Sequence, residues 1–494
     1  MRRLIGQNDS VIDNPDACYA ICLAKDSRFD GVIYVCVTST KIYCRPSCPA
    51  IVPRRENLRF HRTAAASQHA GFRACKRCRP DATPGSPEWN SRADTVGRAM
   101  RMIADGVVDR GGVDALATAL GYSERHVLRL LEGELGVGPV ALARAQRAQS
   151  ARVLIETTAM TFTDITWAAG FSSIRQFNDT IREVFALTPT DMRAKAKLSP
   201  AAASSTLRIR LAYRPPFNAA QIFGFLGFRA IPGMETFDVT TLRYQRALRL
   251  NHGNAIVTLS PILTNAIDCE LSLEDVRDMQ MAVHRCRLLL DLDADPVAIA
   301  DDLRRHEPLK TLVDSRPGLR SPGAVDGHEL AVRALLGQQI SVTAARTHGA
   351  RLAAALGTPL GALATDRIAH TFPTAAAIAE APDELLAMPA SRRNALRGLC
   401  HTLAEGAIDL SPGADRRRSY DQLVALAGIG PWTANYIVMR ALSDPDLFLE
   451  TDLGVQHGLA KLGLATKPRD AARLAAGWAP WRSYVVHYLW ESLT

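Results

Sequence analysis

The chain has 494 residues, of which 47% are hydrophobic and 22% are charged, and its net charge is +9. This length predicts roughly two to four domains, and no apolar run approaches the about 18 residues that a membrane span requires. Residues 1–20 turn polar after five positions and lack the apolar core of a signal peptide. We therefore expect a cytoplasmic protein, in which paired cysteines bind metal or react and disulfides are disfavoured.

The positive charge is concentrated in the first 197 residues. This part has 28 Lys and Arg against 20 Asp and Glu, and the remainder is nearly balanced. Eight basic residues and one acid lie from Arg54 to Arg79, beside a group of cysteines. Such a stripe is either a solvated face or a surface for nucleic-acid phosphates, and its position beside the cysteines favours the phosphates.

Taken in chain order, the sequence divides into four segments. Residues 1–88 contain seven of the ten cysteines and end in the breaker-rich stretch RPDATPGSPEW. Residues 91–197 predict helices separated by glycine turns, and a small-residue linker follows at residues 198–206. Residues 207–290 contain alternating, β-branched segments typical of strands, and residues 291–494 are rich in Ala and Leu and predict helices.

Two cysteine pairs in the first segment have the spacing of a zinc site. Loops of the type C-x3-C and C-x2-C can present four sulfurs tetrahedrally to Zn²⁺. The residues concerned are Cys44, Cys48, Cys75 and Cys78. Three further cysteines fit the pattern less well, and packing in the protein interior is the better interpretation for the first two: Cys18, Cys22 and Cys36.

The residues around these pairs, KIYCRPSCPA…RRENLRF…GFRACKRCRP, resemble the amino-terminal domain of Ada-type DNA repair regulators over most of residues 15–85. The resemblance implies that Cys44 is both a zinc ligand and a nucleophile, which takes a methyl group irreversibly from a methylphosphotriester in the DNA backbone. It also implies that Thr40 and Arg73 contact this backbone. A zinc site with a purely structural role is the alternative.

Electrostatics favours a switch at such a site. Zinc keeps a thiolate deprotonated at neutral pH, and the thiolate is the nucleophilic form. Four thiolates on Zn²⁺ carry a net negative charge, which repels phosphate diesters but not a neutral methylated phosphate. Methylation of Cys44 would reduce that charge, so that the neighbouring arginines bind DNA more firmly.

The middle segment contains two patterns of helix, glycine turn and helix, with turns at Gly121 and Gly170. The second pattern resembles the AraC-type DNA-binding domain, including GFSS, the QF pair and the TP before the final helix. The polar residues after each turn would lie on a recognition helix, although each alone could be a solvated surface residue. The candidate base-contacting residues are Ser123, Glu124, Arg125, His126, Ser173, Arg175 and Gln176.

The last segment contains LVALAGIGPWTANYIVMRAL, in which Gly428 and Gly430 lie between apolar helical residues. This stretch resembles a helix–hairpin–helix motif, whose glycines let backbone N–H groups approach a DNA phosphate. A glycine pair alone is weak evidence, but the apolar residues around it complete the motif.

A resemblance to AlkA, the 3-methyladenine DNA glycosylase II family, extends throughout residues 210–494, in stretches such as YRPPFNAAQIFGFLGFRA and APWRSYVVHYLW. It implies that Asp452 is the catalytic carboxylate, since cleavage of an N-glycosidic bond builds positive charge on the sugar. A helix N-cap is the alternative for this aspartate taken alone. Cationic bases such as 3-methyladenine and 7-methylguanine suit an aromatic pocket, for which core packing is the alternative. Its residues in this family would be Trp432, Tyr436 and Trp490.

Departures from relatives narrow the expected chemistry. Trp432 stands where bifunctional glycosylases have a Schiff-base lysine, so no lyase step is expected. No cysteine follows Cys400, so the iron–sulfur cluster of some relatives is not expected, nor does a Pro-Cys-His-Arg stretch for O6-alkylguanine repair occur. Gln339 stands at the DNA-wedge position, which is typically apolar, and this difference bears on base flipping and substrate preference.

The sequence thus predicts a multidomain fusion. Its expected parts are a small α+β zinc domain (1–88), an all-α tandem helix-turn-helix domain (91–197), a small α+β subdomain with an antiparallel sheet (207–290) and an all-α helix-hairpin-helix glycosylase domain (291–494). The expected function joins methylation-activated transcription with excision of alkylated bases, and its rival is a glycosylase fold that binds DNA without cutting it. Zn²⁺ is the expected cofactor, and double-stranded DNA and RNA polymerase are the expected partners.

Overall fold

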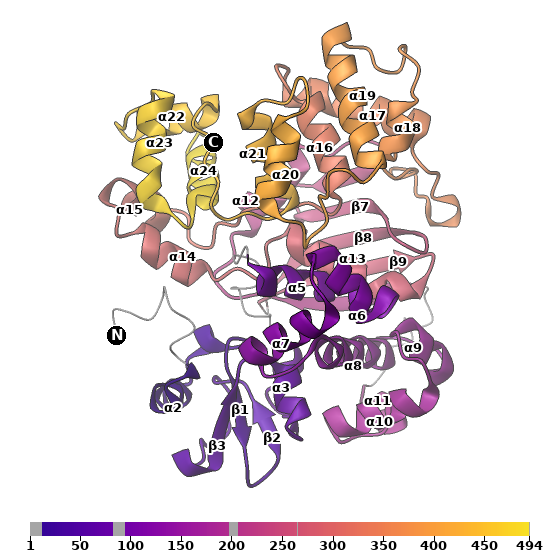
Figure 1. Ribbon diagram of the computed structural model, residues 1–494, viewed down its shortest axis with the longest axis vertical. Coiled ribbons are helices and arrows are strands. Elements are labelled where there is room, and N and C mark those ends of the chain that lie inside the picture. The colour runs from indigo at the N-terminus through magenta and orange to yellow at the C-terminus, as the bar shows by residue number, and fades with distance from the viewer. Residues whose placement is uncertain (1–11, 83–93, 197–205, 264, 494) are drawn as a thin grey trace. The chain divides into compact units, whose positions relative to one another are not determined.

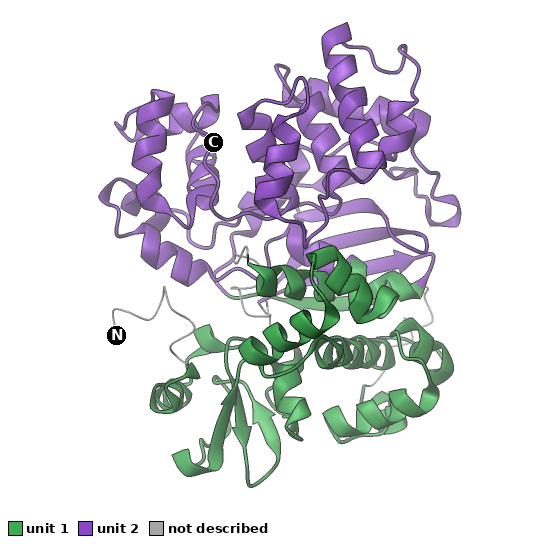
Figure 2. Ribbon diagram, in the orientation of Figure 1, with its two compact units in different colours: residues 1–214, 276–281 green, residues 215–275, 282–494 purple. Residues whose placement is uncertain are grey.

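The computed structural model describes residues 12–82, 94–196, 206–263 and 265–493. The chain forms two compact units, one of residues 1–214 and 276–281 and the other of residues 215–275 and 282–494 (Figure 2). The start of the polar amino terminus, most of the RPDATPGSPEW stretch and almost all of the small-residue linker lie outside the described residues. No helix in the described part of the chain is long and apolar enough to cross a membrane.

Unit 1 begins with a sheet of four strands in the order β3-β1-β2-β4 (Figure 1). Strand β1 (Tyr34–Val37) is antiparallel to β2 (Ile42–Cys44) and β3 (Leu58–His61), and β2 is parallel to the short strand β4 (Arg73–Ala74). Every residue of β1 is buried, so this strand lies at the centre of the sheet's core. The helical elements here are α2 (Pro15–Leu23), α3 (Ala64–His69), and the 3-10 turns η1 (Ser27–Phe29), η2 (Arg55–Asn57) and η3 (Pro80–Ala82).

Three cysteines outside the metal-binding pattern belong to this core. Cys18 and Cys22 lie on α2 and Cys36 lies on β1, and all three are buried. Burial raises the pKa of the three thiols, to about 11, 12 and 12 in chain order. The thiols are therefore protonated at neutral pH and pack as small apolar side chains.

The remainder of unit 1 is helical apart from strand β5 (Thr206–Ala212). Gly121 and Gly170 have φ of 79° and 80°, a backbone conformation that glycine adopts at little cost, and each lies in the turn of a helix-turn-helix pattern. Ala65 and Ala66 of α3 belong to the same core as the first of these helices, so sheet and helices are packed together. The helices are α5 (Thr95–Ala104), α6 (Val107–Leu120), α7 (Glu124–Leu135), α8 (Pro139–Thr157), α9 (Phe162–Ala168), α10 (Ile174–Phe185) and α11 (Pro189–Lys195).

Unit 2 contains a run of four strands in which each strand is antiparallel to the next. These are β6 (Glu235–Asp238), β7 (Arg243–Arg249), β8 (Asn254–Ile262) and β9 (Ala266–Leu273). Helix α12 (Ala219–Phe228) precedes the strands, and the remaining helices follow them. They are α13 (Met279–Leu289), α14 (Pro296–Leu303), α15 (Glu307–Asp314), α16 (Gly327–Leu336), α17 (Val342–Leu356), α18 (Ala375–Ala379), α19 (Ala390–Ala404), α20 (Arg416–Val424), α21 (Pro431–Ala441), α22 (Leu453–Lys461), α23 (Pro468–Ala475) and α24 (Arg482–Glu491).

Helix α21 lies between two separate hydrophobic cores of unit 2. One core contains Leu335 of α16 and Leu399 of α19, and the other contains Leu459 of α22 and Leu489 of α24. Tyr436 of α21 packs against both. Figure 1 shows the two helical groups, with α16–α20 in orange tones and α22–α24 in yellow. Side chains of α21 can therefore reach a space between two packed bodies of helices.

A buried ion network joins the sheet of unit 2 to α16. Arg246 on β7 contacts Glu235 at 3.2 Å and Glu329 at 2.7 Å, and Arg333 bridges the same two carboxylates at 3.1 and 2.8 Å. Burial alone would raise the pKa of Glu235, but the charges of Arg333 and Arg246 lower it below the usual value. Because each charge has a partner, the network fixes α16 and hence the turn that follows it.

Candidate metal centre and candidate active site

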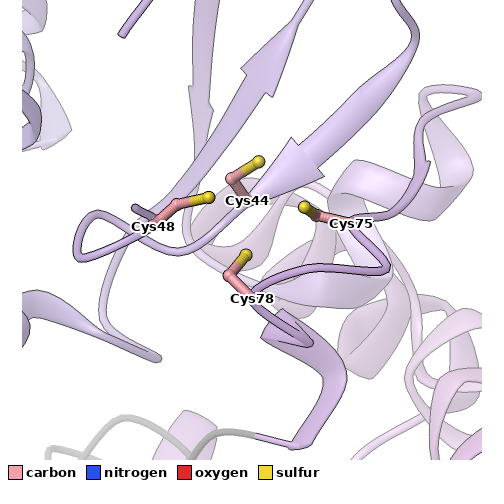
Figure 3. Close-up of side chains that lie close together, drawn as sticks. All are labelled: Cys44, Cys48, Cys75 and Cys78. Atoms are coloured by element: carbon pink, nitrogen blue, oxygen red, sulfur yellow. The ribbon is translucent and has the colours of Figure 1, made fainter. Parts of the chain in front are cut away.

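The four cysteines of the predicted zinc site come together at one end of the small sheet. Cys44 ends β2 and Cys75 follows β4, and the parallel pairing of these strands makes them neighbours, with the Cys75 N–H donating to the Tyr43 carbonyl at 3.0 Å. Figure 3 shows the Cys44, Cys48, Cys75 and Cys78 side chains turned toward a common centre. Their sulfurs all lie within 4.8 Å of one another. A tetrahedral zinc with Zn–S bonds of about 2.3 Å requires sulfurs about 3.8 Å apart, so this donor set fits Zn²⁺.

The electrostatics of the cluster also fits a cation. A hydrogen bond with Cys78, together with burial and the neighbouring sulfurs, raises the pKa of the Cys44 thiol. The bond from Cys44 lowers the pKa of the Cys78 thiol to about 6. Sulfurs that share protons in this way become four thiolates only when a positive ion offsets their mutual repulsion. Cys44 is half-buried, whereas the other three are buried, so it is the most accessible of the four sulfurs.

Two residues that the sequence did not single out hold the loop between Cys44 and Cys48. Asp30 accepts hydrogen bonds from the Ser47 N–H at 3.1 Å and the Ser47 hydroxyl at 2.5 Å. The Lys25 ammonium donates to the Cys48 carbonyl at 2.5 Å and also to the Ala50 carbonyl. These contacts give the CRPSC loop a fixed shape, and no local sequence pattern marks Lys25 or Asp30.

The predicted DNA-backbone contacts lie at the edge of the same sheet. Thr40 is exposed in the turn between β1 and β2, and Arg73 is half-buried on β4. The Arg73 N–H donates to the carbonyl of Lys41 at 2.9 Å, so the two predicted residues lie on adjoining segments. Lys76 and Arg77, between the second pair of cysteines, are exposed.

The candidate base-contacting residues of the two helix-turn-helix patterns differ in role. Ser123 and Ser173 are N-caps of α7 and α10, and their side chains accept hydrogen bonds from the N–H groups of His126 and Gln176. Glu124 is exposed in the first turn of α7, His126 stacks on Tyr122 with ring centroids 4.6 Å apart, and Gln176 accepts hydrogen bonds from Ser172. The exposed cations after the turns are Arg125 and Arg175.

A charge network that sequence analysis missed joins the zinc loop to the long helix α8. Arg79, directly after Cys78, contacts Glu156 at 3.2 Å. Glu156 also accepts from Arg152 at 2.8 Å, and Arg152 reaches Asp81 at 2.8 Å. Arg79 and Asp81 are near one another in the sequence, but their partners Glu156 and Arg152 lie on α8, 77 and 71 residues further along the chain, so no local sequence pattern connects them.

Asp452 lies where a carboxylate is held by three N–H donors. It is the N-cap of α22, and its Oδ1 accepts from the Val455 N–H at 2.9 Å and from the Trp490 indole at 2.8 Å. Its Oδ2 accepts from the Trp432 indole at 3.1 Å. A carboxylate oxygen accepts hydrogen bonds, so these three N–H groups hold both Asp452 oxygens in place. Asp452 is therefore the N-cap of α22 and also accepts hydrogen bonds from two indoles.

Gly454 makes room for this arrangement. A Cβ at Gly454 would lie 2.8 Å from Cδ1 of Trp490, 3.0 Å from its Nε1 and 3.1 Å from Oδ1 of Asp452. A larger residue would therefore push the indole away from the carboxylate. The sequence contains this glycine two residues after the aspartate, but only the packing shows why it is there.

Aromatic rings surround the carboxylate. Trp432 and Tyr436 are stacked with centroids 5.4 Å apart and planes at 8°, and Trp490 lies 6.5 Å from Tyr436. Phe225 of α12, which sequence analysis did not select, stacks on Trp490 at 6.4 Å. With Asp452, these rings line a cavity of about 730 Å³, large enough for one base.

Arginines at the same cavity act on Tyr436. Arg440 donates to the Tyr436 hydroxyl at 3.0 Å and lies 4.8 Å from the centre of the Phe225 ring, and Arg229 lies 3.7 Å from that ring. Burial alone would raise the pKa of the Tyr436 phenol, but the charges of Arg440, Arg229 and Arg333 lower it below the usual value. The lining of the cavity is therefore both aromatic and cationic.

The glycine hairpin and the candidate wedge lie beside this cavity. Gly428 has φ of 86°, and Gly430 is the N-cap of α21, with no heavy atom within 4 Å of the position that a Cβ would take. Gln339 is exposed and has φ of 57°, in the turn between α16 and α17. Gly337 and Ile340, on either side of it, line the cavity. The structure thus brings the predicted phosphate-binding and wedge residues to the same functional region of unit 2.

These two sites define a class of protein in which a DNA-binding regulator with a four-sulfur metal centre is joined to a DNA base-excision enzyme. Models of known families match the chain at three places: the metal binding domain of Ada at residues 17–81, a helix-turn-helix domain at 116–195, and the AlkA N-terminal domain at 208–326.

Three relatives show how the parts are combined. The chain is 50% identical over 488 residues to a Mycobacterium tuberculosis protein described as a probable bifunctional transcriptional activator/DNA repair enzyme AlkA, with 97% of each chain covered. It is 33% identical to the Escherichia coli DNA-3-methyladenine glycosylase 2, over 57% of this chain and 95% of the relative. It is 35% identical to the E. coli bifunctional transcriptional activator/DNA repair enzyme Ada, over 26% of this chain and 35% of the relative.

The chain belongs to the family of bifunctional AlkA-type transcriptional activators and DNA repair enzymes. Its four-cysteine cluster is a zinc site, and the protein binds DNA. The multidomain organisation expected from the sequence is confirmed at this level: an amino-terminal zinc domain, a helix-turn-helix domain and a DNA glycosylase part.

Proposed function

We propose that this protein is a methylation-activated transcription regulator fused to a monofunctional DNA glycosylase. In this proposal Cys44 accepts a methyl group from a methylphosphotriester in DNA, and Asp452 excises alkylated bases such as 3-methyladenine and 7-methylguanine. The observation that carries it is the presence in one chain of an accessible cysteine within a four-sulfur cluster and a carboxylate held by two indoles in an aromatic cavity.

In the proposed methyl transfer, the Cys44 thiolate attacks the methyl carbon of a neutral phosphotriester. A sulfur–carbon bond forms while the methyl carbon–oxygen bond breaks, and the electron pair of that bond stays on the phosphate, which becomes a charged diester. Zn²⁺, when bound, supplies the thiolate form at neutral pH. Cys44 ends as a thioether, so the transfer occurs once and leaves a less negative site.

The less negative site would then bind DNA more firmly. Thr40 and Arg73 would contact the backbone near the methylated phosphate, since both lie on adjoining segments at the sheet edge. Arg125, Arg175 and Gln176 would contact the operator, because each lies in the first turn of a helix after a glycine turn. Bound at a promoter, the protein would recruit RNA polymerase.

In the proposed excision, a flipped base enters the cavity and stacks on Trp432, Tyr436 and Trp490. Asp452, held in position by three N–H donors, stabilises the positive charge that develops on the deoxyribose or orients the attacking water. The base leaves with the bonding electron pair, and water supplies the hydroxyl group of the abasic sugar. With an indole at position 432 in place of a lysine amine, the reaction ends at the abasic site.

The hairpin and the wedge would hold the DNA during this reaction. The N–H groups at Gly428 and Gly430 would bind a backbone phosphate at the start of α21. Gln339 would fill the gap that the flipped base leaves in the duplex.

The proposal includes the division of the chain and its location. The parts are a small α+β zinc domain (1–88), an all-α tandem helix-turn-helix domain (91–197), an α+β subdomain with an antiparallel sheet (207–290) and an all-α helix-hairpin-helix glycosylase domain (291–494). Because the substrate of both sites is chromosomal DNA, the protein would act in the cytoplasm.

One experiment tests both activities. The full-length protein is incubated with DNA carrying radiolabelled methyl groups, and label is counted separately on the protein and in released bases. We expect Cys44→Ala to lose only label on the protein and Asp452→Asn to lose only base release. If Asp452→Asn releases bases as fast as wild type, the glycosylase assignment is wrong; if Cys44→Ala still becomes labelled, the acceptor assignment is wrong.

A further inference from the structure

The turn between α16 and α17 carries two adjacent glutamines with different surroundings. Gln339, at the wedge position, is exposed and has a left-handed backbone with φ of 57°. Gln338 is half-buried, and its side-chain amide donates to the Gly428 carbonyl at 3.3 Å and to the Thr433 hydroxyl at 2.9 Å. One glutamine thus faces solvent while its neighbour is bonded to another part of unit 2.

The two partners of Gln338 belong to the elements that would contact DNA. Gly428 is the first glycine of the hairpin proposed to bind phosphate. Thr433 is buried in the first turn of α21, next to Trp432, which donates to Asp452. A single amide therefore joins the wedge turn to the phosphate-binding hairpin and to the helix that carries the base pocket.

The start of the turn is anchored separately. Arg392 on α19 donates to the carbonyl groups of Leu335 and Leu336 at 3.3 and 3.0 Å, which lie at the end of α16. Beyond this anchor, the left-handed conformation at Gln339 is unfavourable for a residue with a Cβ and persists only where surrounding contacts hold it. The bonds of Gln338 lie one residue before this position.

We propose that Gln338 is a positioning residue for base excision, which fixes the wedge turn in register with the hairpin and the pocket helix. Phosphate binding at the hairpin and entry of Gln339 into the base stack then take place as one docking event of a preformed surface. This inference rests on the proposed glycosylase function. Its physical reason is that a wedge must fill a gap of atomic size, so a small displacement of the turn lowers the population of flipped base.

In this proposal Gln338 affects base flipping and not the cleavage of the glycosidic bond. Gln338 does not line the cavity, whereas Asp452 and the rings do. Its loss should slow excision from a normally paired duplex, in which flipping must be driven by the wedge. It should matter little where the opposite strand offers no partner, because the lesion is then already unstacked.

The test compares Gln338→Met, which keeps the length of the side chain and removes the amide, with Gln339→Ala, which removes the wedge. Single-turnover excision of 7-methylguanine is measured in two duplexes, one with cytosine opposite the lesion and one with an abasic site. For both variants we expect a loss of about tenfold on the paired lesion and of about twofold or less on the lesion opposite the abasic site. An equal loss on both duplexes, or no loss on the paired one, would overturn the positioning role.

A second measurement covers the case in which a variant folds poorly. In an Asp452→Asn background, the fluorescence of 2-aminopurine placed beside the lesion reports flipping without excision. Thr433→Val removes one acceptor of the Gln338 amide, and we expect its effect not to add to that of Gln338→Met. Full additivity, or unchanged fluorescence in Gln338→Met, would also refute the proposal. If the protein is not a glycosylase at all, the wild type will release no base from either duplex, and this outcome differs from every outcome that concerns Gln338.

Discussion

The indole of Trp490 donates its N–H to Oδ1 of Asp452 over 2.8 Å. The ring proposed to stack on the base therefore also orients the carboxylate proposed to act on the sugar. Because the two residues are 38 positions apart, on α24 and at the start of α22, this bond depends on the packing of those helices against each other.

Trp490→Phe keeps an aromatic ring and removes the N–H donor. We expect single-turnover excision to fall about ten- to hundredfold, since a hydrogen bond to a charged group is worth about 1.5–3 kcal/mol. Trp481→Phe is the matched control, because Trp481 packs in the same core without lining the cavity. Equal losses in the two variants would show that loss of either indole from this core lowers activity, and that the bond to Asp452 has no particular importance.

Gly454→Ala should inactivate excision without disturbing the backbone. A Cβ there would come within 3.0 Å of the Trp490 indole, so the ring must move off Asp452. Base release is measured beside Gly398→Ala, a helical glycine on α19 whose added Cβ meets nothing within 4 Å. We expect the control to retain activity and to be slightly more stable, as alanine favours a helix over glycine by about 1 kcal/mol. If Gly454→Ala keeps full activity, the close packing of the Trp490 indole against Gly454 is not needed for excision.

Removal of zinc should separate the two activities. A strong chelator should abolish methyl transfer to Cys44 and lower the melting temperature of unit 1, since it removes the ion that would link the two cysteine loops. Excision should persist, because the cavity is formed by residues of unit 2 alone. The measurements are metal content, protein labelling and base release on one sample, and parallel loss of both activities would be the contrary result.

Glu156→Gln should weaken the link between methylation and DNA binding. Glu156 bridges Arg79, beside the zinc ligand Cys78, to Arg152 on α8. We expect methyl transfer at the wild-type rate, but a gain in DNA affinity on methylation that is smaller by about three- to tenfold. Affinity for a methylphosphotriester duplex is measured before and after methylation.

The control for this variant is Glu183→Gln, which breaks the ion pair between the exposed Glu183 of α10 and Arg144 of α8. It should leave the gain unchanged, since exposed pairs contribute little. If Glu156→Gln shows the full gain in DNA affinity on methylation, the network only stabilises the fold.

Glu235→Gln should destabilise unit 2 by about 3–5 kcal/mol at neutral pH, because it leaves the buried Arg246 and the half-buried Arg333 with one carboxylate fewer. The pKa of Glu235 is lowered in the folded state, so its contribution is present above the ordinary glutamate value of about 4.3 and is lost as the pH falls through the folded value. Urea unfolding at several pH values should show that the difference in free energy of unfolding between variant and wild type disappears only in acid. If this difference in free energy of unfolding does not depend on pH, the stability does not come from an ionised Glu235.

Short-range features of both sites could be predicted from the sequence. The spacing of Cys44 and Cys48 and of Cys75 and Cys78, and the position of Gly428 and Gly430 between apolar runs, depend on neighbours along the chain. A metal loop or a glycine turn is specified within a few residues, because the covalent chain limits how its donors or N–H groups can be placed. The family resemblance then supplied Asp452 and the pocket rings as expectations.

Only the tertiary structure decided which distant residues complete these sites. Phe225 joins the rings from α12, Asp30 holds the CRPSC loop, and Gln338 connects the wedge turn to the hairpin. Their partners are 17 to 265 residues away along the chain, and such contacts form only when separate segments pack. Sequence patterns report what is close along the chain, whereas orientation of a carboxylate or a turn depends on what packing brings close in space.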